Sequence, residues 1–187
     1  MLSDKFKVAV IGYAGDVNSF PVVDVADTAY QLGCRLAEEG YIVLTGGRDG
    51  IMHLVSKGAS EKGAIVLGVT PYSSGGITPY AVEISTGLDM AMRSGVLLNS
   101  ADAVVSIGGA AGTAIEIFMA YSYRKPLILI ENTGGWTDRL ISIIRMEEIF
   151  ANEGKGYSLD YRKGGGIFIA TSVDEVIDIL KSIRAGI

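Results

Sequence analysis

Short apolar runs alternate along this chain with segments of helical periodicity, and this alternation limits the possible folds more than any other feature. The runs are five to seven residues long, which suits strands that are buried within a sheet. They lie at residues 6–12, 41–45, 64–69, 81–85, 102–107, 126–130 and 166–170. Helical patterns occupy residues 24–39, 49–62, 88–100, 113–124 and 137–144, and a last one starts at residue 172.

Strands that are separated by helices predict a particular kind of sheet. Parallel neighbours need a crossover connection, and a helix supplies it. Right-handed crossovers on both sides give a doubly wound, Rossmann-like α/β fold, with a mostly parallel sheet of about seven strands and helices on both faces. The length of 187 residues suits one domain, which we expect to cover residues 1–187.

Local signals place some element boundaries. Gly40 follows the helical pattern at 24–39 and predicts its end. Ser172 and Glu175 form a capping-box pattern at the start of the last helix. Residues 70–80 predict a loop, because proline and glycine are frequent there. Residues 145–166 mix charge with glycine and predict no definite element, so a mobile flap and a solvated insertion are equal alternatives.

Composition and charge exclude several classes of function. A net charge of −5 disfavours nucleic-acid binding by phosphate neutralisation. The single cysteine, Cys34, excludes a disulfide framework and predicts a reducing, cytoplasmic location. The single histidine, His53, argues against a zinc site and a Ser-His-Asp triad, so we expect no metal. No apolar run approaches the roughly 18 residues of a membrane-spanning helix, and we expect no membrane association.

Two turns between a strand and a helix share the pattern Gly-Gly-x-x-Gly. One holds Gly46, Gly47 and Gly50, and the other holds Gly108, Gly109 and Gly112, followed by Thr113. Gly12 ends the first strand and adds a third glycine turn at the same edge of the sheet. Backbone N–H groups at a helix N-terminus can bind an anion such as a phosphate, although glycines also serve simply to turn the chain. The pattern is neither a dinucleotide fingerprint nor a P-loop, so we expect no nicotinamide cofactor.

Two charged residues are candidates for the chemistry. Arg93 lies in a largely apolar helical segment, where it could form a structural ion pair or present a planar fork to a phosphate or carboxylate. Glu116 follows Thr113 by three residues. This spacing fits a capping box, with Thr113 as the N-cap, and equally a carboxylate that faces a bound ligand.

These motifs resemble the LONELY GUY (LOG) family, which has also been called lysine decarboxylase-like. The resemblance is carried by Met90-Ala91-Met92-Arg93, by the strand at 101–107 and by Gly108-Gly109-x-x-Gly112-Thr113-x-x-Glu116. Members cleave the N-glycosidic bond of nucleoside 5′-monophosphates, which releases the base and ribose 5-phosphate. The resemblance implies that Arg93 and Glu116 are catalytic and that Gly109, Gly112 and Thr113 bind phosphate. It also implies a homodimer or another homo-oligomer.

The chain departs from that family at two places. Ile107 replaces a proline before the double glycine, and the His-Glu-Arg-Lys run reads Ala91-Met92-Arg93-Ser94. These departures make it similar to molybdenum-cofactor carrier proteins, which bind a phosphorylated pterin without reaction. Two hypotheses follow: a phosphoribohydrolase for nucleoside 5′-monophosphates, or a non-catalytic carrier or sensor for a phosphorylated pterin or nucleotide.

Overall fold

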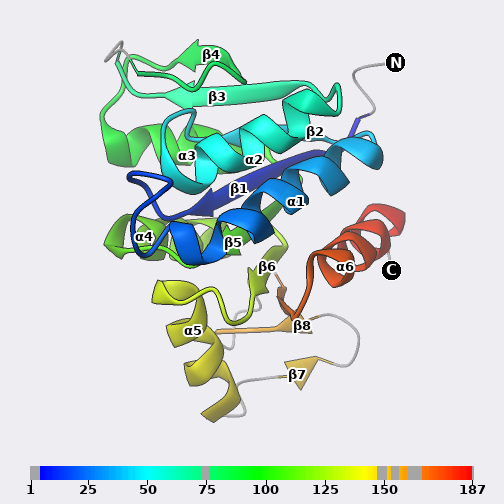
Figure 1. Cartoon of the computed structure of the whole chain (residues 1–187). Coiled ribbons are helices and arrows are strands. Elements are labelled where there is room, and N and C mark those ends of the chain that lie inside the picture. Colours follow the sequence, from blue (N-terminus) through cyan, green and yellow to red (C-terminus); the bar gives the residue numbers. More distant parts are fainter. Residues whose placement is uncertain (1–4, 73–75, 147–150, 153–155, 160–165, 187) are drawn as a thin grey trace.

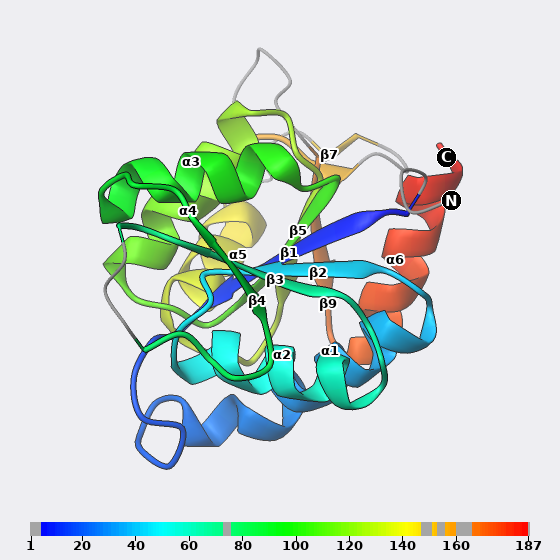
Figure 2. The ribbon, with the colours of Figure 1, turned by 90° about the horizontal axis from the view of Figure 1, so that it is seen from above.

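The computed structural model describes residues 5–72, 76–146, 151–152, 156–159 and 166–186. These residues form one twisted sheet with helices on both faces (Figures 1 and 2). The central strands are β1 (Lys7–Gly12), β2 (Ile42–Thr45), β3 (Val66–Thr70), β5 (Ala103–Ile107) and β6 (Leu127–Ile130). The outer strands are β4 (Val82–Ser85), β7 (Ala151–Asn152), β8 (Gly156–Tyr157) and β9 (Ile167–Ala170).

The strand order within the described residues is β4-β3-β2-β1-β5-β6-β9-β8-β7. The seven strands from β4 to β9 in this order are parallel, whereas β8 and β7 are antiparallel. The predicted doubly wound, mostly parallel sheet is therefore confirmed. Its order reverses at β1, because the chain moves outward to β4 and then returns to place β5 on the other side. Ligands of such folds bind at the carboxyl ends of the strands beside this reversal.

The helices cover the two faces in two groups. They are α1 (Ala26–Glu38), α2 (Gly50–Glu61), α3 (Met90–Ser100), α4 (Ala111–Ser122), α5 (Gly135–Met146) and α6 (Val173–Ala185), with a short 3₁₀ helix at Val23–Val25. α1, α2 and α6 pack on one face, and α3, α4 and α5 pack on the other (Figure 2). Alternate residues of β1 pack into the two cores. Val8 and Val10 lie in the core with α1, α2 and α6, and Ala9 and Ile11 lie in the core with α3, α4 and α5.

Several predicted boundaries hold, and the structure excludes one of the two alternatives for Thr113. Gly40 adopts a left-handed conformation, with φ of 73°, just after α1. At α6 the Ser172 hydroxyl accepts the Glu175 N–H at 3.2 Å, as the capping box predicts. Thr113 does not cap α4, because that helix already begins at Ala111 with Ala110 at the N-cap. Part of the uncertain stretch at 145–166 forms β7 and β8, and the remainder lies largely outside the described residues.

Candidate functional site

A pocket of about 280 Å³ opens at the reversal point of the sheet. It lies at the carboxyl end of β1 and between α3 and α4. Its lining residues are Gly12, Ala14, Met52, Met90, Ala91, Arg93, Ser94, Ala110, Gly112, Thr113, Ile115 and Glu116. The lining is mostly apolar with a few polar groups, which is the usual character of a small-molecule site.

Arg93 is the cation of this pocket. Only 5% of the residue is exposed, and its side chain makes no hydrogen bond within the described part of the chain. Its nearest counter-charge is Glu116, with 3.8 Å between Nη1 and Oε1. Burial lowers the pKa of Arg93, the charge of Glu116 raises it, and the charge of Arg48 lowers it. The Nε–H of this guanidinium is buried without an acceptor in the described structure, and such an unused donor is costly unless a ligand accepts it.

Glu116 is the anion of the pocket and lies in the second turn of α4. Its side chain is 15% exposed, and one oxygen accepts a hydrogen bond of 2.7 Å from the Ser94 hydroxyl. Burial raises the pKa of Glu116, and neither the Ser94 hydrogen bond nor the Arg93 charge offsets the effect. The carboxylate therefore faces Arg93 and Ser94 rather than capping its own helix, which decides between the two geometries that the spacing left open.

The N-terminus of α4 forms another wall of the pocket. The N-cap residue, Ala110, supplies no side-chain hydrogen bond to the helix, and Gly112 has open space beside its Cα atom. The Thr113 hydroxyl donates to the Gly12 carbonyl oxygen at 3.0 Å, which ties the helix to the end of β1. The first N–H groups of a helix have no intrahelical acceptor, and the helix dipole makes this end positive. This wall suits an anion.

Comparison with known proteins agrees with this architecture. A family model described as LDcluster4, the SLOG cluster4 family, matches residues 5–155. The chain belongs to the SLOG cluster4 family. It is 32% identical over 131 residues to the cytokinin riboside 5′-monophosphate phosphoribohydrolase LOG7 of Arabidopsis thaliana, a match that covers 63% of this chain and 58% of that protein. The predicted resemblance to LOG proteins is thus confirmed, although the chain spans little more than half the length of this relative.

Solved structures extend the match over nearly the whole chain. The X-ray structure of the structural-genomics target TM1055 superposes with a TM-score of 0.85 at 47% identity and covers 95% of this chain and 99% of that one. The molybdenum cofactor carrier protein from Chlamydomonas reinhardtii has a TM-score of 0.75 at 28% identity and covers 97% of this chain and 99% of its own. The chain therefore shares the fold of these two structures over nearly all of its length.

Some of the predicted site residues of this SLOG protein meet at the pocket. Gly12, Arg93, Gly112, Thr113 and Glu116 all line it, although they come from three separate elements. Gly46 contributes indirectly: a Cβ atom there would lie 2.8 Å from Nη1 of Arg93, so the absence of a side chain leaves room for the guanidinium.

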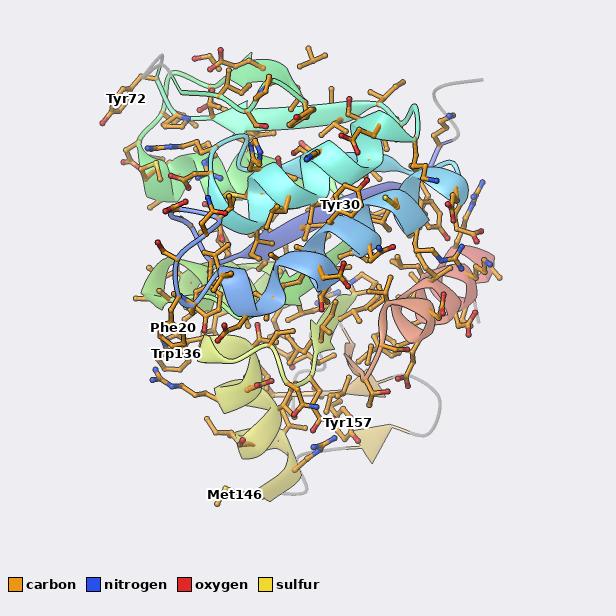
Figure 3. The ribbon with its side chains drawn as sticks, viewed as in Figure 1. Phe20, Tyr30, Tyr72, Trp136, Met146 and Tyr157 are labelled. Atoms are coloured by element: carbon orange, nitrogen blue, oxygen red, sulfur yellow. The ribbon has the colours of Figure 1, made fainter. Side chains whose placement is uncertain are left out.

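The other predicted glycines do not line the pocket. Gly47 and Gly50 are packed against backbone, of Gly68 and of Tyr13 and Ala14 respectively, where a Cβ atom would collide. The Gly108 N–H is already bound to the Thr133 hydroxyl at 2.9 Å. The Gly109 carbonyl oxygen accepts the backbone N–H of Trp136, at the start of α5 (Figure 3). Ligand binding by these four glycines remains a prediction.

Sequence reasoning did not anticipate part of the lining. Ser94 follows Arg93 directly and supplies the hydrogen bond to Glu116, whereas Met52, Met90 and Ile115 supply apolar walls. Met52, Met90 and Ile115 all fall in the first or second turn of a helix that begins at the carboxyl edge of the sheet. That position was a usable signal, because such turns border the crevice in doubly wound folds.

The described residues support neither metal binding nor membrane crossing. No group of three or more His, Cys, Asp and Glu side chains there could hold a metal ion. No helix of this described part is both long and apolar enough to cross a membrane.

Proposed function

We propose that this pocket binds a nucleoside 5′-monophosphate and hydrolyses its N-glycosidic bond. One observation carries the proposal: the buried guanidinium of Arg93 has no hydrogen-bond partner in the described structure and lies 3.8 Å from the Glu116 carboxylate. The LOG7 relative, whose name gives it this activity, supports the choice.

The phosphate is assigned to the N-terminus of α4. Gly112 leaves the approach open, and Ala110 leaves the first N–H groups without a side-chain cap. A dianionic phosphate gains both hydrogen bonds and the favourable field of the helix dipole in this position. Glu116, one helical turn further along, then lies beside the ribose.

Glu116 and Arg93 stabilise the two opposite charges that develop during the reaction. As the bond between C1′ and the base nitrogen breaks, the electron pair leaves with the base, and C1′ becomes oxocarbenium-like. The carboxylate of Glu116 stabilises this positive charge and accepts a proton from the water whose oxygen bonds to C1′. Arg93 stabilises the negative charge on the departing base, which finally takes up a proton. The reaction yields the free base and ribose 5-phosphate.

A second candidate function is non-catalytic carriage of a phosphorylated pterin or nucleotide. The observation in its favour is the match over nearly the whole chain to a molybdenum cofactor carrier protein. Such a carrier would use the same uncapped helix and the same arginine, but turnover would be absent. For either function we propose a homo-oligomer that acts in the cytoplasm on free small molecules.

Turnover distinguishes the two functions. The purified protein is incubated with a panel of nucleoside 5′-monophosphates, and ribose 5-phosphate is measured. We expect release with the wild type and a loss of about 10²-fold or more in Glu116→Gln, because the amide cannot take the proton. Glu61→Gln is the matched control, since Glu61 accepts a hydrogen bond from Tyr30 at 2.7 Å outside the pocket. Binding without release by the wild type would overturn the hydrolase and favour the carrier.

A further inference from the structure

The glycine turn between β2 and α2 has no part in the mechanism above, although two side chains of the pocket lie against it. A Cβ atom on Gly46 would lie 2.7 Å from Sδ of Met52 and 2.8 Å from Nη1 of Arg93. Both distances are shorter than an ordinary contact, so the thioether and the guanidinium both use the space that this glycine leaves. Met52 also lines the pocket and is half-buried. The sulfur of Met52 and the charged end of Arg93 are therefore neighbours within the pocket.

The backbone that carries Met52 is held from two sides. Met52 lies in the first turn of α2, where the preceding N–H group, that of Ile51, donates to the Tyr13 carbonyl oxygen at 2.9 Å. Just before the helix, the Gly47 carbonyl oxygen accepts the Thr78 N–H at 2.8 Å. Two neighbouring loops thus fix the start of α2 and, with it, the point from which the Met52 side chain reaches the pocket.

The charged end of Arg93 has little else to fix its orientation. Its Nε–H is buried without an acceptor in the described structure, and Glu116 lies 3.8 Å from Nη1, beyond the length of a hydrogen bond. Attraction between charges is much less directional than a hydrogen bond, so packing must hold the guanidinium plane. A guanidinium is planar and weakly hydrated, and a thioether is soft and polarizable, so the two groups pack well together. The structure places the guanidinium against Gly46 and beside Met52.

We infer that Met52 is a positioning residue, which holds the guanidinium of Arg93 in place by packing rather than by hydrogen bonds. The inference rests on the proposed function for the task of Arg93, which is to stabilise the negative charge on the departing base. That charge exists only in the transition state, so a displaced guanidinium costs more in kcat than in KM. The turn at Gly46 then serves the site indirectly, because it leaves space for both side chains.

Two substitutions of Met52 test this role in the absence of any ligand. Met52→Ala removes the thioether, whereas Met52→Leu nearly conserves its volume. The NMR cross-peak of the Arg93 Nε–H group reports on the guanidinium, and its loss in Arg93→Lys assigns it. We expect this cross-peak to shift or broaden in Met52→Ala and to keep its wild-type position in Met52→Leu. Met52→Val, which shortens the side chain less, takes the place of an alanine variant that does not fold.

Turnover is measured on the same variants with adenosine, guanosine, cytidine and uridine 5′-monophosphates. We expect kcat for release of ribose 5-phosphate to fall about tenfold in Met52→Ala, with KM within about twofold of wild type, and to recover in Met52→Leu. Met119→Ala is the matched control. Met119 is also half-buried, but it packs against the core of α3, α4 and α5 and does not line the pocket. This control should leave both the Arg93 cross-peak and kcat unchanged.

The cross-peak and the turnover separate this inference from the proposed function. An unchanged Arg93 cross-peak in Met52→Ala, or a Met52→Leu variant as impaired as Met52→Ala, would overturn the role of Met52. A raised KM at wild-type kcat would also overturn it, because that result marks a direct contact with the ligand. A shifted cross-peak that leucine restores, without release of ribose 5-phosphate by the wild type, would overturn the hydrolase and support the positioning by Met52.

Discussion

The burial of Arg93 and its lack of hydrogen bonds indicate what this site does. A charged side chain that is 5% exposed is normally held by several hydrogen bonds, and this one has none in the described structure. Glu116 attracts it across 3.8 Å, yet both groups have pKa values shifted towards their neutral forms, because burial outweighs the attraction. The pair therefore contributes little to folding by itself, and its geometry suits ligand binding.

Ser94 should set the pH at which Glu116 becomes active. Its hydroxyl donates to the carboxylate at 2.7 Å and thereby lowers the pKa of Glu116 against the effect of burial. Ser94→Ala should raise that pKa further. Fewer molecules then hold the carboxylate form at acidic pH, so the acidic limb of the rate profile should move to higher pH.

Rate measurements across pH check this expectation. Ser122→Ala is the matched control, because the Ser122 hydroxyl donates only to the Phe118 carbonyl oxygen of the same helix, at 2.8 Å. An unchanged acidic limb in Ser94→Ala would show that Glu116 does not control the rate.

At the level of residues, the sequence predicted the centre of the site better than its surroundings. Arg93, Glu116 and Thr113 carry distinctive chemistry, and all three line the pocket. Glycine patterns are ambiguous, because a glycine needed for close packing looks the same as one needed for a ligand. Gly108 illustrates this: a side chain there would collide with the Tyr13 ring, which is remote from it in sequence.

Among the elements, the turn after β2 holds Arg93 in place, and Gly46→Ala should disturb it. The new Cβ atom would lie 2.7 Å from Sδ of Met52 and 2.8 Å from Nη1 of Arg93, so the guanidinium must move. We expect ligand affinity to fall about tenfold, because a shifted arginine loses its hydrogen bonds to the ligand.

Calorimetry with a nucleoside 5′-monophosphate that binds the wild type measures the effect of Gly46→Ala on ligand affinity. Gly95→Ala in α3 is the control, since the nearest atom to its Cβ would be the Tyr123 hydroxyl at 3.2 Å, and its affinity should stay within about twofold of wild type. Wild-type affinity in Gly46→Ala would refute the role given to this turn.

Element types were predictable from periodicity, whereas some element ends depended on tertiary contacts. α4 begins two residues before Thr113, because the Thr113 hydroxyl bonds across to the Gly12 carbonyl oxygen instead of capping its own helix. The hairpin of β7 and β8 gave little local signal, since each strand has only two residues. Its pairing with β9 depends on contacts that no local pattern encodes.

For the whole molecule, the sequence predicted a doubly wound sheet but left the strand order open. Alternating elements require crossovers, yet they do not say on which side of β1 the chain returns. The order β4-β3-β2-β1-β5 follows from the packing of two cores on opposite faces. The position of the pocket follows from this order, since β1 and β5 meet at Gly12 and Ile107.

The exposed surface of the molecule predicts its oligomeric state. Apolar side chains are exposed on the two helices that flank the pocket, at Met90, Met92, Val96, Ile115 and Phe118. Exposed apolar side chains on these two helices favour association, and we expect the wild type to be a homo-oligomer through α3 and α4. Phe118→Glu should yield monomers, because burial of its charge would cost several kcal/mol.

Light scattering after size exclusion measures the assembly. Phe20→Glu is the matched control: Phe20 is 81% exposed on the loop before α1 (Figure 3), whereas Phe118 is 47% exposed. We expect the control to keep the mass of the wild type. A monomeric wild type at micromolar concentration would contradict the prediction.

The unsatisfied guanidinium of Arg93 also has a consequence for the lifetime of the protein in the cell. A ligand that binds only the folded state adds about 2.7 kcal/mol of stability at roughly 100 times its dissociation constant. Proteases act on the small unfolded fraction, so a change of this size alters abundance several-fold. A cell that runs short of the ligand would then degrade the protein faster. The amount of protein would follow the supply of the molecule it binds, without any separate regulator.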